Sequence, residues 1–361
     1  MTTMTTMEID RQALVDRLFE ATVATLELYG VYLGERLGLY RVLAAEADVN
    51  AAGLAEKAGV HQRYAREWLE QQAVAGILTA TGDGDEERRF TLPAPHREVL
   101  ADPENPAYVA PFALLVAGIG GALPRVADAF RTGGGVAWEA YGPDVRDGQA
   151  AINRPAFLHD LASWLAAMPD VVARLRSTPP ARVADVACGA GWSSIALASA
   201  FPDVLVDGID LDDAAIADAT RNAAAAGVAD RVSFAARDAA EPALAGRYDL
   251  VCIFEALHDM AQPVEALEAA RAMLVAGGSV LVVDERVADR FTAPGDLVER
   301  MMYGWSAVCC LPTAMVTQPS AATGTVLRAG LLREYGARAG FSTVKVLDVD
   351  NDLFRFYQLL P

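Results

Sequence analysis

The last half of the chain alternates short apolar runs with stretches of helical period. Apolar runs bounded by turn residues predict strands at 181–187, 204–210, 232–236, 249–254 and 279–285. Two more are expected at 342–349 and 353–359, the second of them at an edge of the sheet. Because helical patterns separate most of these runs, residues 177–361 predict a doubly wound, mostly parallel seven-stranded sheet.

Two of the intervening helices have recognisable ends. A helix is predicted from 212 to 225, with Gly227 as the glycine just beyond its last turn. The amphipathic stretch 264–274 predicts another helix, which Gly277 and Gly278 should stop. Sheets of this kind bind ligands beyond the carboxyl ends of their strands, so functional residues are expected at that edge.

The first hundred residues follow a different pattern. Residues 51–60 and 61–78 predict two helices joined by a turn at Gly59, with His61 capping the second helix. The stretch 79–92 predicts a hairpin with a Gly-Asp-Gly tip. An otherwise all-helical winged-helix domain is therefore expected over residues 1–100.

A winged helix can bind DNA, or it can serve as a packing or dimerisation module. Residues 1–100 hold 10 basic and 16 acidic residues, and in the second helix the arginines at 63 and 66 are balanced by the glutamates at 67 and 70. A helix that reads DNA normally lies in a basic patch. The charge balance therefore favours dimerisation over a DNA-binding regulator.

The middle region, residues 101–176, is expected to form apolar helices. Phe157, Leu161 and Trp164 recur at helical spacing. This spacing is typical of ordinary core and also of a bridge or lid that covers a pocket in the last domain. The uncharged stretch 105–124 has the length of a membrane span. Its prolines and glycines, and its lack of basic flanks, favour a buried helix instead.

Composition narrows the possible partners and the compartment. The chain carries a net charge of −18, which repels nucleic-acid phosphates and anionic lipid surfaces. Its four cysteines form no C-x-x-C pair and are too few for a disulfide framework. The first twelve residues lack the apolar core of a signal peptide. A cytoplasmic protein without nucleic-acid or membrane partners is expected.

Chemistry concentrates in the stretch VADVACGAGWSS at 183–194. A predicted strand, then Gly189 and Gly191, then a helix start form a turn that brings backbone N–H groups close to a ligand. Asp210, at the end of the next strand, suits the two hydroxyls of a ribose. An adenosine-bearing ligand is expected, and NAD, FAD and S-adenosylmethionine all fit this much.

Two residues separate these ligands. Ser194 stands where a dinucleotide fingerprint requires glycine or alanine. Asp185, at the strand end, would repel a pyrophosphate but suits the ammonium and sulfonium of S-adenosylmethionine. A buried acid that merely caps local N–H groups is the alternative for Asp185. An NAD-dependent oxidoreductase is thereby disfavoured.

These motifs resemble those of the class I S-adenosylmethionine-dependent methyltransferases, which have a Rossmann-like sheet. The segment Asp185 to Gly191 matches their first motif, with Ala187 in place of the first glycine. Segments 208–219, 237–242 and 248–260 resemble the three motifs that follow. The resemblance implies a cofactor site made by the following residues: Asp185, Gly189, Gly191, Asp210, Leu211, Asp238, Ala239, Phe254 and Glu255.

The front half adds to this resemblance. Segments 37–45, 54–60, 69–80 and 88–92 resemble the winged-helix domain of bacterial and plant small-molecule O-methyltransferases. In that group the domain joins two subunits and does not bind DNA. The resemblance thus implies a homodimer formed through residues 1–100.

His258 is the candidate catalytic residue. It follows the fourth strand in the segment ALHDM, where a His-Asp pair of the plant-like O-methyltransferases supplies the general base. The resemblance implies that His258 takes the proton of a phenol or alcohol acceptor. A histidine that orients the acceptor or caps the next helix is the alternative. Met260 stands where those enzymes carry tryptophan.

The acceptor pocket is expected between the middle region and residues 299–312. The methionines there would give a flexible apolar wall, which suits a flat or lipid-like metabolite. No cluster of metal-binding side chains is evident in the sequence, so no metal is expected. The candidate acceptor contacts are Phe157, Trp164, Met301, Met302 and Trp305.

The sequence leaves the acceptor and the methylated atom open. Transfer to oxygen is the first hypothesis. Transfer to nitrogen or carbon is an alternative, as is use of the same cofactor for rearrangement, decarboxylation or hydroxylation.

Overall fold

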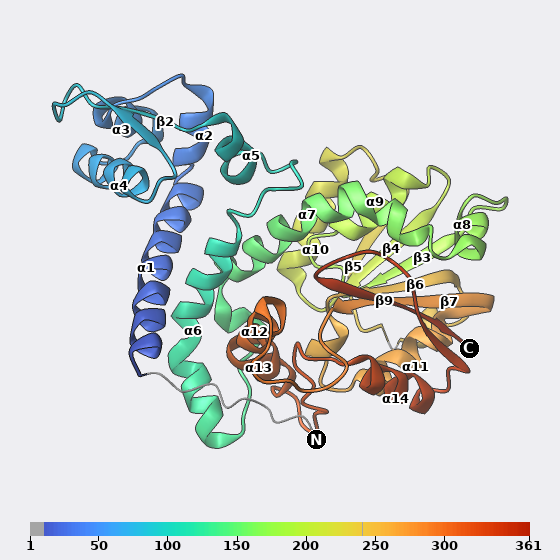
Figure 1. Ribbon diagram of the computed structural model, residues 1–361. Helices are drawn as coiled ribbons and strands as arrows, with labels where there is room; N and C mark the ends of the chain where they lie inside the picture. The colour runs from blue at the N-terminus through green and yellow to red at the C-terminus, as the bar shows by residue number, and fades with distance from the viewer. Residues whose placement is uncertain (1–10, 240) are drawn as a thin grey trace. The chain divides into compact units, whose positions relative to one another are not determined.

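A computed structural model describes residues 11–239 and 241–361. The chain forms two compact units, Met1–Ala117 and Gly118–Pro361 (Figure 1). The bridge predicted over 101–176 is thus divided between the two units. The segment examined for a signal peptide lies largely outside the described residues.

The first unit has the helices and the hairpin that its sequence predicts. The elements are α1 (Arg11–Arg36), α2 (Leu39–Ala45), α3 (Ala51–Ala58), α4 (Gln62–Val74), β1 (Thr79–Thr81), β2 (Arg89–Thr91) and α5 (Ala94–Leu100). β1 and β2 pair antiparallel. His61 caps α4 as predicted, because its ring accepts a hydrogen bond from the Arg63 N–H.

The basic side chains of α4 are neutralised within the domain. Arg63 pairs with Glu67, and Arg66 pairs with Glu70 at 3.2 Å. Arg66 also reaches Asp85 at the hairpin tip, at 2.5 Å. This helix therefore presents no unbalanced basic patch to a DNA backbone.

Helix α6 (Phe112–Thr132) is the one helix among the described residues that is long and apolar enough to cross a membrane. Its buried residues Leu115, Ile119, Ala122 and Val126 recur at helical spacing, so they form one face. Such a one-sided pattern is typical of a helix packed in a folded domain.

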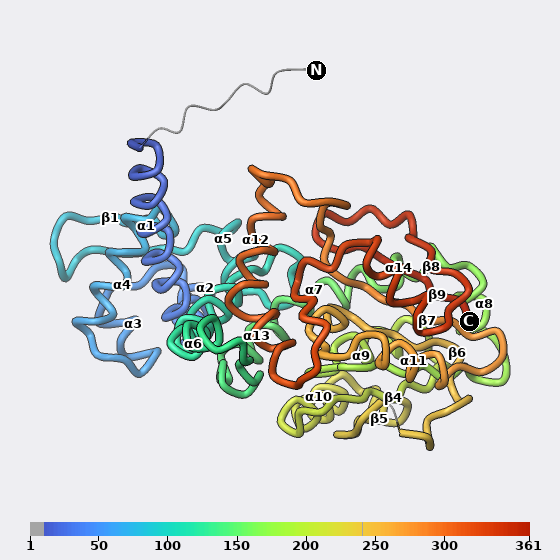
Figure 2. Tube along the Cα trace, turned by 90° about the horizontal axis from the view of Figure 1, so that it is seen from below, coloured from blue at the N-terminus to red at the C-terminus, as the bar shows by residue number. Residues whose placement is uncertain are grey.

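The second unit is built on a seven-stranded sheet, as predicted. Its strands are β3 (Arg182–Val186), β4 (Leu205–Asp210), β5 (Val232–Ala236), β6 (Tyr248–Phe254), β7 (Leu274–Glu285), β8 (Thr343–Val346) and β9 (Phe354–Leu360). Their order is β5-β4-β3-β6-β7-β9-β8, which Figure 2 shows from β5 at the bottom to β8 at the top. The first five in this order run parallel, and β9 is antiparallel to both of its neighbours.

Helices cover both faces of this sheet (Figure 1). One face packs against α7 (Pro143–Leu165), α8 (Pro169–Leu175) and α9 (Trp192–Ala200). The other face packs against α11 (Pro263–Met273) and α14 (Ala329–Arg338). Helix α10 (Asp213–Ala225) connects β4 to β5 and is capped by Asp212.

Two details of the sheet differ from the sequence prediction. The last strand, β9, is not at the edge, because it inserts between β7 and β8. The consecutive residues Phe356 and Tyr357 of β9 point to opposite faces of the sheet, and both are buried. Strand β9 must therefore be covered on both faces. The edge strand is β8, where Thr343 and Lys345 are exposed.

The second correction concerns Gly277 and Gly278. Helix α11 already ends at Met273, and both glycines lie inside strand β7. A side chain at Gly278 would approach the carbonyl oxygens of Asp249 and Tyr248 to 3.0 and 3.1 Å. The glycine is therefore needed for close approach of two strands, where β6 and β7 shift register.

Candidate active site

The turn after β3 has the shape that its glycines predict. Ala187, Gly189 and Gly191 all have positive φ angles, of 58°, 51° and 79°. A side chain at Gly189 would meet open space, whereas one at Gly191 would lie 2.6 Å from Phe234. Gly189 is thus the position open to a ligand, and Gly191 lets α9 pack tightly against β5. Ala187 adopts a conformation that strains a residue with a side chain.

Asp210 braces this turn from the end of β4. Its Oδ2 accepts a hydrogen bond from the Gly189 N–H at 2.9 Å, and its Oδ1 accepts one from the Asp212 N–H at 2.9 Å. Each carboxylate oxygen has a second lone pair, so the same group can also accept from ribose hydroxyls.

Asp185 is more enclosed than the sequence indicates. It is buried, and its Oδ2 accepts hydrogen bonds from the hydroxyls of Ser193 and Ser194, both at 2.6 Å. Its Oδ1 is buried without a hydrogen-bond partner among the described residues. Burial raises the pKa of this carboxyl to about 6 although both serines stabilise its charge. Ser194, noted only as a departure from the dinucleotide pattern, is thus a partner of Asp185.

The other predicted cofactor residues lie at the carboxyl ends of adjacent strands. Leu211 and Asp238 are exposed after β4 and β5, and Ala239 is half-buried. Phe254 ends β6 and packs edge-to-face on Phe157, with ring centroids 5.2 Å apart. Because β5, β4, β3 and β6 are neighbours in this order, the fold brings the predicted residues to one edge.

Glu255 follows Phe254 in a strained conformation, with a φ of 50°. The amide of Gln149 on α7 donates to its Oε2 at 3.4 Å. Burial and the nearby Glu285 raise the pKa of Glu255 to about 8. A carboxyl in this environment is largely protonated at neutral pH.

His258 is buried in a short 3-10 turn, Leu257–Asp259, just beyond β6. Its Nδ1 lies 2.9 Å from Asp284 Oδ1 and 3.1 Å from Glu285 Oε2. Since carboxylates only accept, Nδ1 carries the proton. The second nitrogen, Nε2, then carries the lone pair or a second proton. Burial opposes the charged imidazole, but the surrounding carboxylates outweigh it and hold the pKa of His258 well above its ordinary value.

Asp284 and Glu285 are the residues that the sequence analysis missed. They end strand β7, which pairs with β6 so that Phe254 lies opposite Val283. Strand pairing therefore places Asp284 beside the segment that carries His258. The available signal was a pair of acids at the carboxyl end of an apolar run, the edge where ligands bind.

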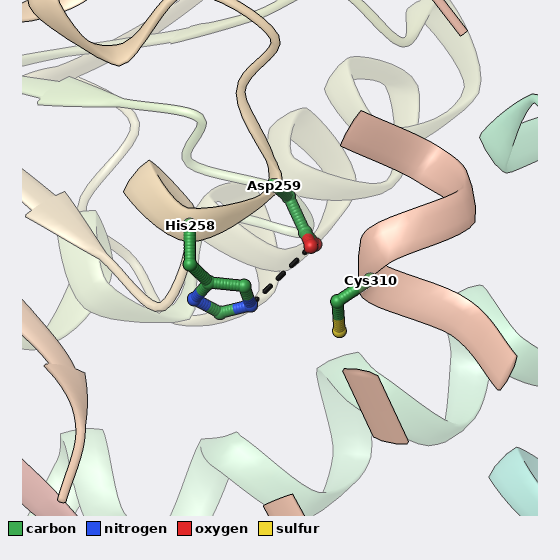
Figure 3. A group of neighbouring side chains, drawn as sticks. All are labelled: His258, Asp259 and Cys310. Carbon is green, nitrogen blue, oxygen red and sulfur yellow. Dashed lines mark ion pairs between the residues drawn. The ribbon is translucent and has the colours of Figure 1, made fainter. Parts of the chain in front are cut away.

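The Nε2 side of His258 faces two further polar side chains, those of Asp259 and Cys310. Asp259 Oδ1 lies 3.3 Å from Nε2, and Cys310 projects toward the same space from the facing helix (Figure 3). Burial raises the pKa of Asp259 to about 6. Sequence analysis did not find this cluster, because Cys310 is far along the chain from His258 and Asp259 and only the fold brings it near them.

Cys310 ends a π-helical turn, Ser306–Cys310, between α12 (Leu297–Trp305) and α13 (Leu311–Ala314). Single π turns of this kind are rare and occur frequently at functional sites. The Tyr141 hydroxyl lies 3.1 Å from the carbonyl oxygen of Val308 and 3.3 Å from that of Cys309. This contact ties the π turn to the segment before α7.

The residues predicted to contact the acceptor have different environments. Met302 is buried, whereas Met301 and Trp305 are half-buried on α12. Phe157 and Trp164 lie in the core between α7 and the sheet, where Trp164 packs on Phe356 with ring centroids 5.2 Å apart. The structure thus gives Trp164 a packing role, while the acceptor contacts remain predictions.

Comparison with known families agrees with this geometry. Residues 183–278 match the family described as a methyltransferase domain, and residues 24–102 match an Rv2258c-like winged HTH domain. The chain thus carries a methyltransferase domain and an N-terminal winged helix-turn-helix domain. The expectation of a winged helix in the first hundred residues is confirmed.

Solved structures show that the whole chain shares an established fold. It resembles the mitomycin 7-O-methyltransferase MmcR with a TM-score of 0.71 and 19% identity, over 97% of this chain and 98% of that one. A putative O-methyltransferase from Nostoc punctiforme matches with a TM-score of 0.70 and 19% identity, over 96% of this chain and 99% of that one. Human N-acetylserotonin methyltransferase, solved in complex with SAM, matches with a TM-score of 0.67 and 17% identity, over 99% of each chain.

The two glycines of the methyltransferase turn should respond differently to substitution. We expect Gly191→Ala to destabilise the fold by about 3 kcal/mol or more, because the new methyl group overlaps Phe234 and Ala219. Gly189→Ala should cost only about 1–2 kcal/mol, since only the φ angle is strained. Urea unfolding of both variants measures this, and equal losses would contradict the assigned roles.

Proposed function

We propose that this methyltransferase transfers a methyl group from S-adenosylmethionine to a hydroxyl oxygen of a small apolar or aromatic metabolite. The proposal rests chiefly on the geometry of His258, whose Nδ1 is held by Asp284 at 2.9 Å. A histidine fixed in this way presents Nε2 as a base of defined direction. The O-methyltransferases among the solved structures of this fold agree with it.

The described residues fit S-adenosylmethionine. The orphaned Oδ1 of Asp185 offers a buried acceptor for a cationic amino group, and Asp210 offers lone pairs for ribose hydroxyls. Gly189 leaves open space where a side chain would lie. A pyrophosphate at this edge would meet two carboxylates, which disfavours a dinucleotide. The cofactor, when bound, supplies a methyl group already activated on a sulfonium.

The residues around the acceptor then have to remove one proton and exclude water. In its neutral form, His258 would take the hydroxyl proton at Nε2 while Asp284 stabilises the resulting imidazolium. The burial of His258 keeps bulk water from competing with the acceptor. The side chains of α12 would supply the apolar wall.

We also propose that the enzyme is a cytoplasmic homodimer. Helix α1 leaves Leu14, Leu18, Phe19 and Leu26 exposed by 52%, 59%, 70% and 62%. A stripe of this kind on one long helix suits burial against a second copy. The four free cysteines suit a reducing compartment.

Replacement of His258 should separate catalysis from cofactor binding. Protein, methyl-labelled S-adenosylmethionine and a metabolite extract would be incubated, and labelled products identified by mass spectrometry. We expect His258→Gln to lower the labelling rate by about 100-fold or more, with S-adenosylhomocysteine affinity by calorimetry changed little. His159→Gln, an exposed histidine of the same unit, is the control. Full labelling by His258→Gln would refute the base role but not the transferase function.

The charge of Asp185 should appear in the pH dependence of cofactor binding. Its pKa is about 6, so the carboxylate is present above that pH and lost below it. We expect the Kd for S-adenosylmethionine to be flat above pH 7 and to rise by up to about tenfold per pH unit below 6.

The control for this prediction is a second carboxyl with a similar pKa. In Asp185→Asn the affinity should be weaker at neutral pH and insensitive to pH near 6. Asp259→Asn, whose native carboxyl also has a pKa of about 6, should keep the wild-type profile. A profile that follows Asp259 instead would remove Asp185 from the cofactor site.

A substitution on α1 tests whether this helix forms the interface of the proposed dimer. We expect Phe19→Asp to shift the protein from dimer to monomer in analytical ultracentrifugation, because a charge in a buried apolar contact is costly. Phe291→Asp, equally exposed at 69% in the second unit, should leave the dimer intact. A dimer that persists in Phe19→Asp would place the interface elsewhere.

A further inference from the structure

We propose that His258, Asp259 and Cys310 form a binding site for Zn²⁺, and that zinc bound there blocks methyl transfer. The candidate donor atoms of the three residues lie within 4.8 Å of one another. In Figure 3 the Asp259 carboxylate points at the ring of His258, and Cys310 enters from the facing helix.

The chemistry of the donors favours zinc over Mg²⁺ and Ca²⁺. One nitrogen, one carboxylate oxygen and one sulfur match the ligands of Zn²⁺, whereas Mg²⁺ and Ca²⁺ prefer sets made only of oxygen. Three protein ligands leave a fourth position for water. Binding requires the Cys310 thiolate, so each Zn²⁺ that forms an S–Zn bond releases the thiol proton to solvent.

The outer partner that a zinc-binding histidine needs is already present. A ligating imidazole normally donates its other ring N–H to a carboxylate. Asp284 accepts from Nδ1 at 2.9 Å and is itself fully buried. This hydrogen bond fixes the ring with Nε2 toward Asp259 and Cys310.

The excess of negative charge around the His258 ring supports the binding of a cation beside it. Among the described residues, the ion pairs of Asp259, Asp284 and Glu285 all share the one imidazole of His258. Asp259 Oδ1, Asp284 Oδ2 and Glu285 Oε2 are buried without a hydrogen-bond partner. Buried carboxylates are stabilised by pairing or by metal coordination. Zinc between Nε2, Asp259 and Cys310 would supply both a positive charge and a partner for Asp259.

The inhibitory effect rests on the proposed function, whereas the binding itself does not. Zinc on Nε2 occupies the lone pair that would accept the acceptor proton. Most of the predicted cofactor residues follow β3, β4 and β5, whereas the proposed zinc ligands follow β6 or lie in the π turn after α12. We therefore expect zinc to stop transfer while cofactor binding continues.

Cobalt provides a direct readout of the site. Titration of the metal-free protein with CoCl₂ should give a thiolate-to-cobalt charge-transfer band that saturates at one Co²⁺ per chain, and ZnCl₂ should displace it. Cys310→Ser should abolish the band, and Asp259→Asn should weaken Co²⁺ binding at least tenfold. Cys309→Ser is the matched control and should retain the band. Circular dichroism confirms that each variant is folded.

Two results would overturn the site. One is the absence of a charge-transfer band in wild-type protein, and the other is a band that survives in Cys310→Ser. A labelling assay then tests inhibition, with ZnCl₂ expected to reduce transfer by wild-type protein more strongly than by Cys310→Ser, each relative to its own metal-free rate. Cobalt binding without inhibition by zinc would leave the metal site standing and would refute its blocking role.

Discussion

The hydrogen bond between His258 and Asp284 is the interaction on which the proposed active site depends. A fully buried carboxylate is stable only when a partner compensates its charge, and Asp284 finds that partner in the imidazole Nδ1. The two residues come from the ends of neighbouring parallel strands, β6 and β7. The pairing of these strands therefore sets the distance between the two side chains and the direction in which Nε2 faces.

The same principle operates at the cofactor edge with different partners. Asp185 is balanced by two serine hydroxyls from the first turn of α9, and Asp210 by backbone N–H groups of the turns after β3 and β4. Each carboxylate stabilises a turn and keeps acceptor capacity for a ligand. Mutations of these carboxylates therefore combine structural and binding effects.

Sequence patterns identified those parts of the site whose residues are close along the chain. The turn at 187–191 and Asp210 could be found because a strand, a glycine turn and a helix follow one another directly. Asp284, Glu285 and Cys310 could not be found in this way, since their proximity to His258 depends on strand order and on a π turn in a distant helix. The position of β9 was mispredicted for the same reason, because a chain end is often an edge strand but a return hairpin placed β8 outside it.

The site also has to limit its own negative charge. Three carboxyl groups contact the one imidazole and Glu255 lies nearby, so full ionisation of all four in a buried site would be costly. Burial raises the pKa of Glu255 to about 8 and that of Glu285 to about 7, so these groups keep part of their protons at neutral pH. In the proposed transfer, the positive charge of a sulfonium and the negative charge of an ionised hydroxyl oxygen are both lost. A pocket that has little net charge and excludes bulk water favours this loss of charge. A pocket that holds its protons in this way can stay closely packed around His258 and still accept a cation when one arrives.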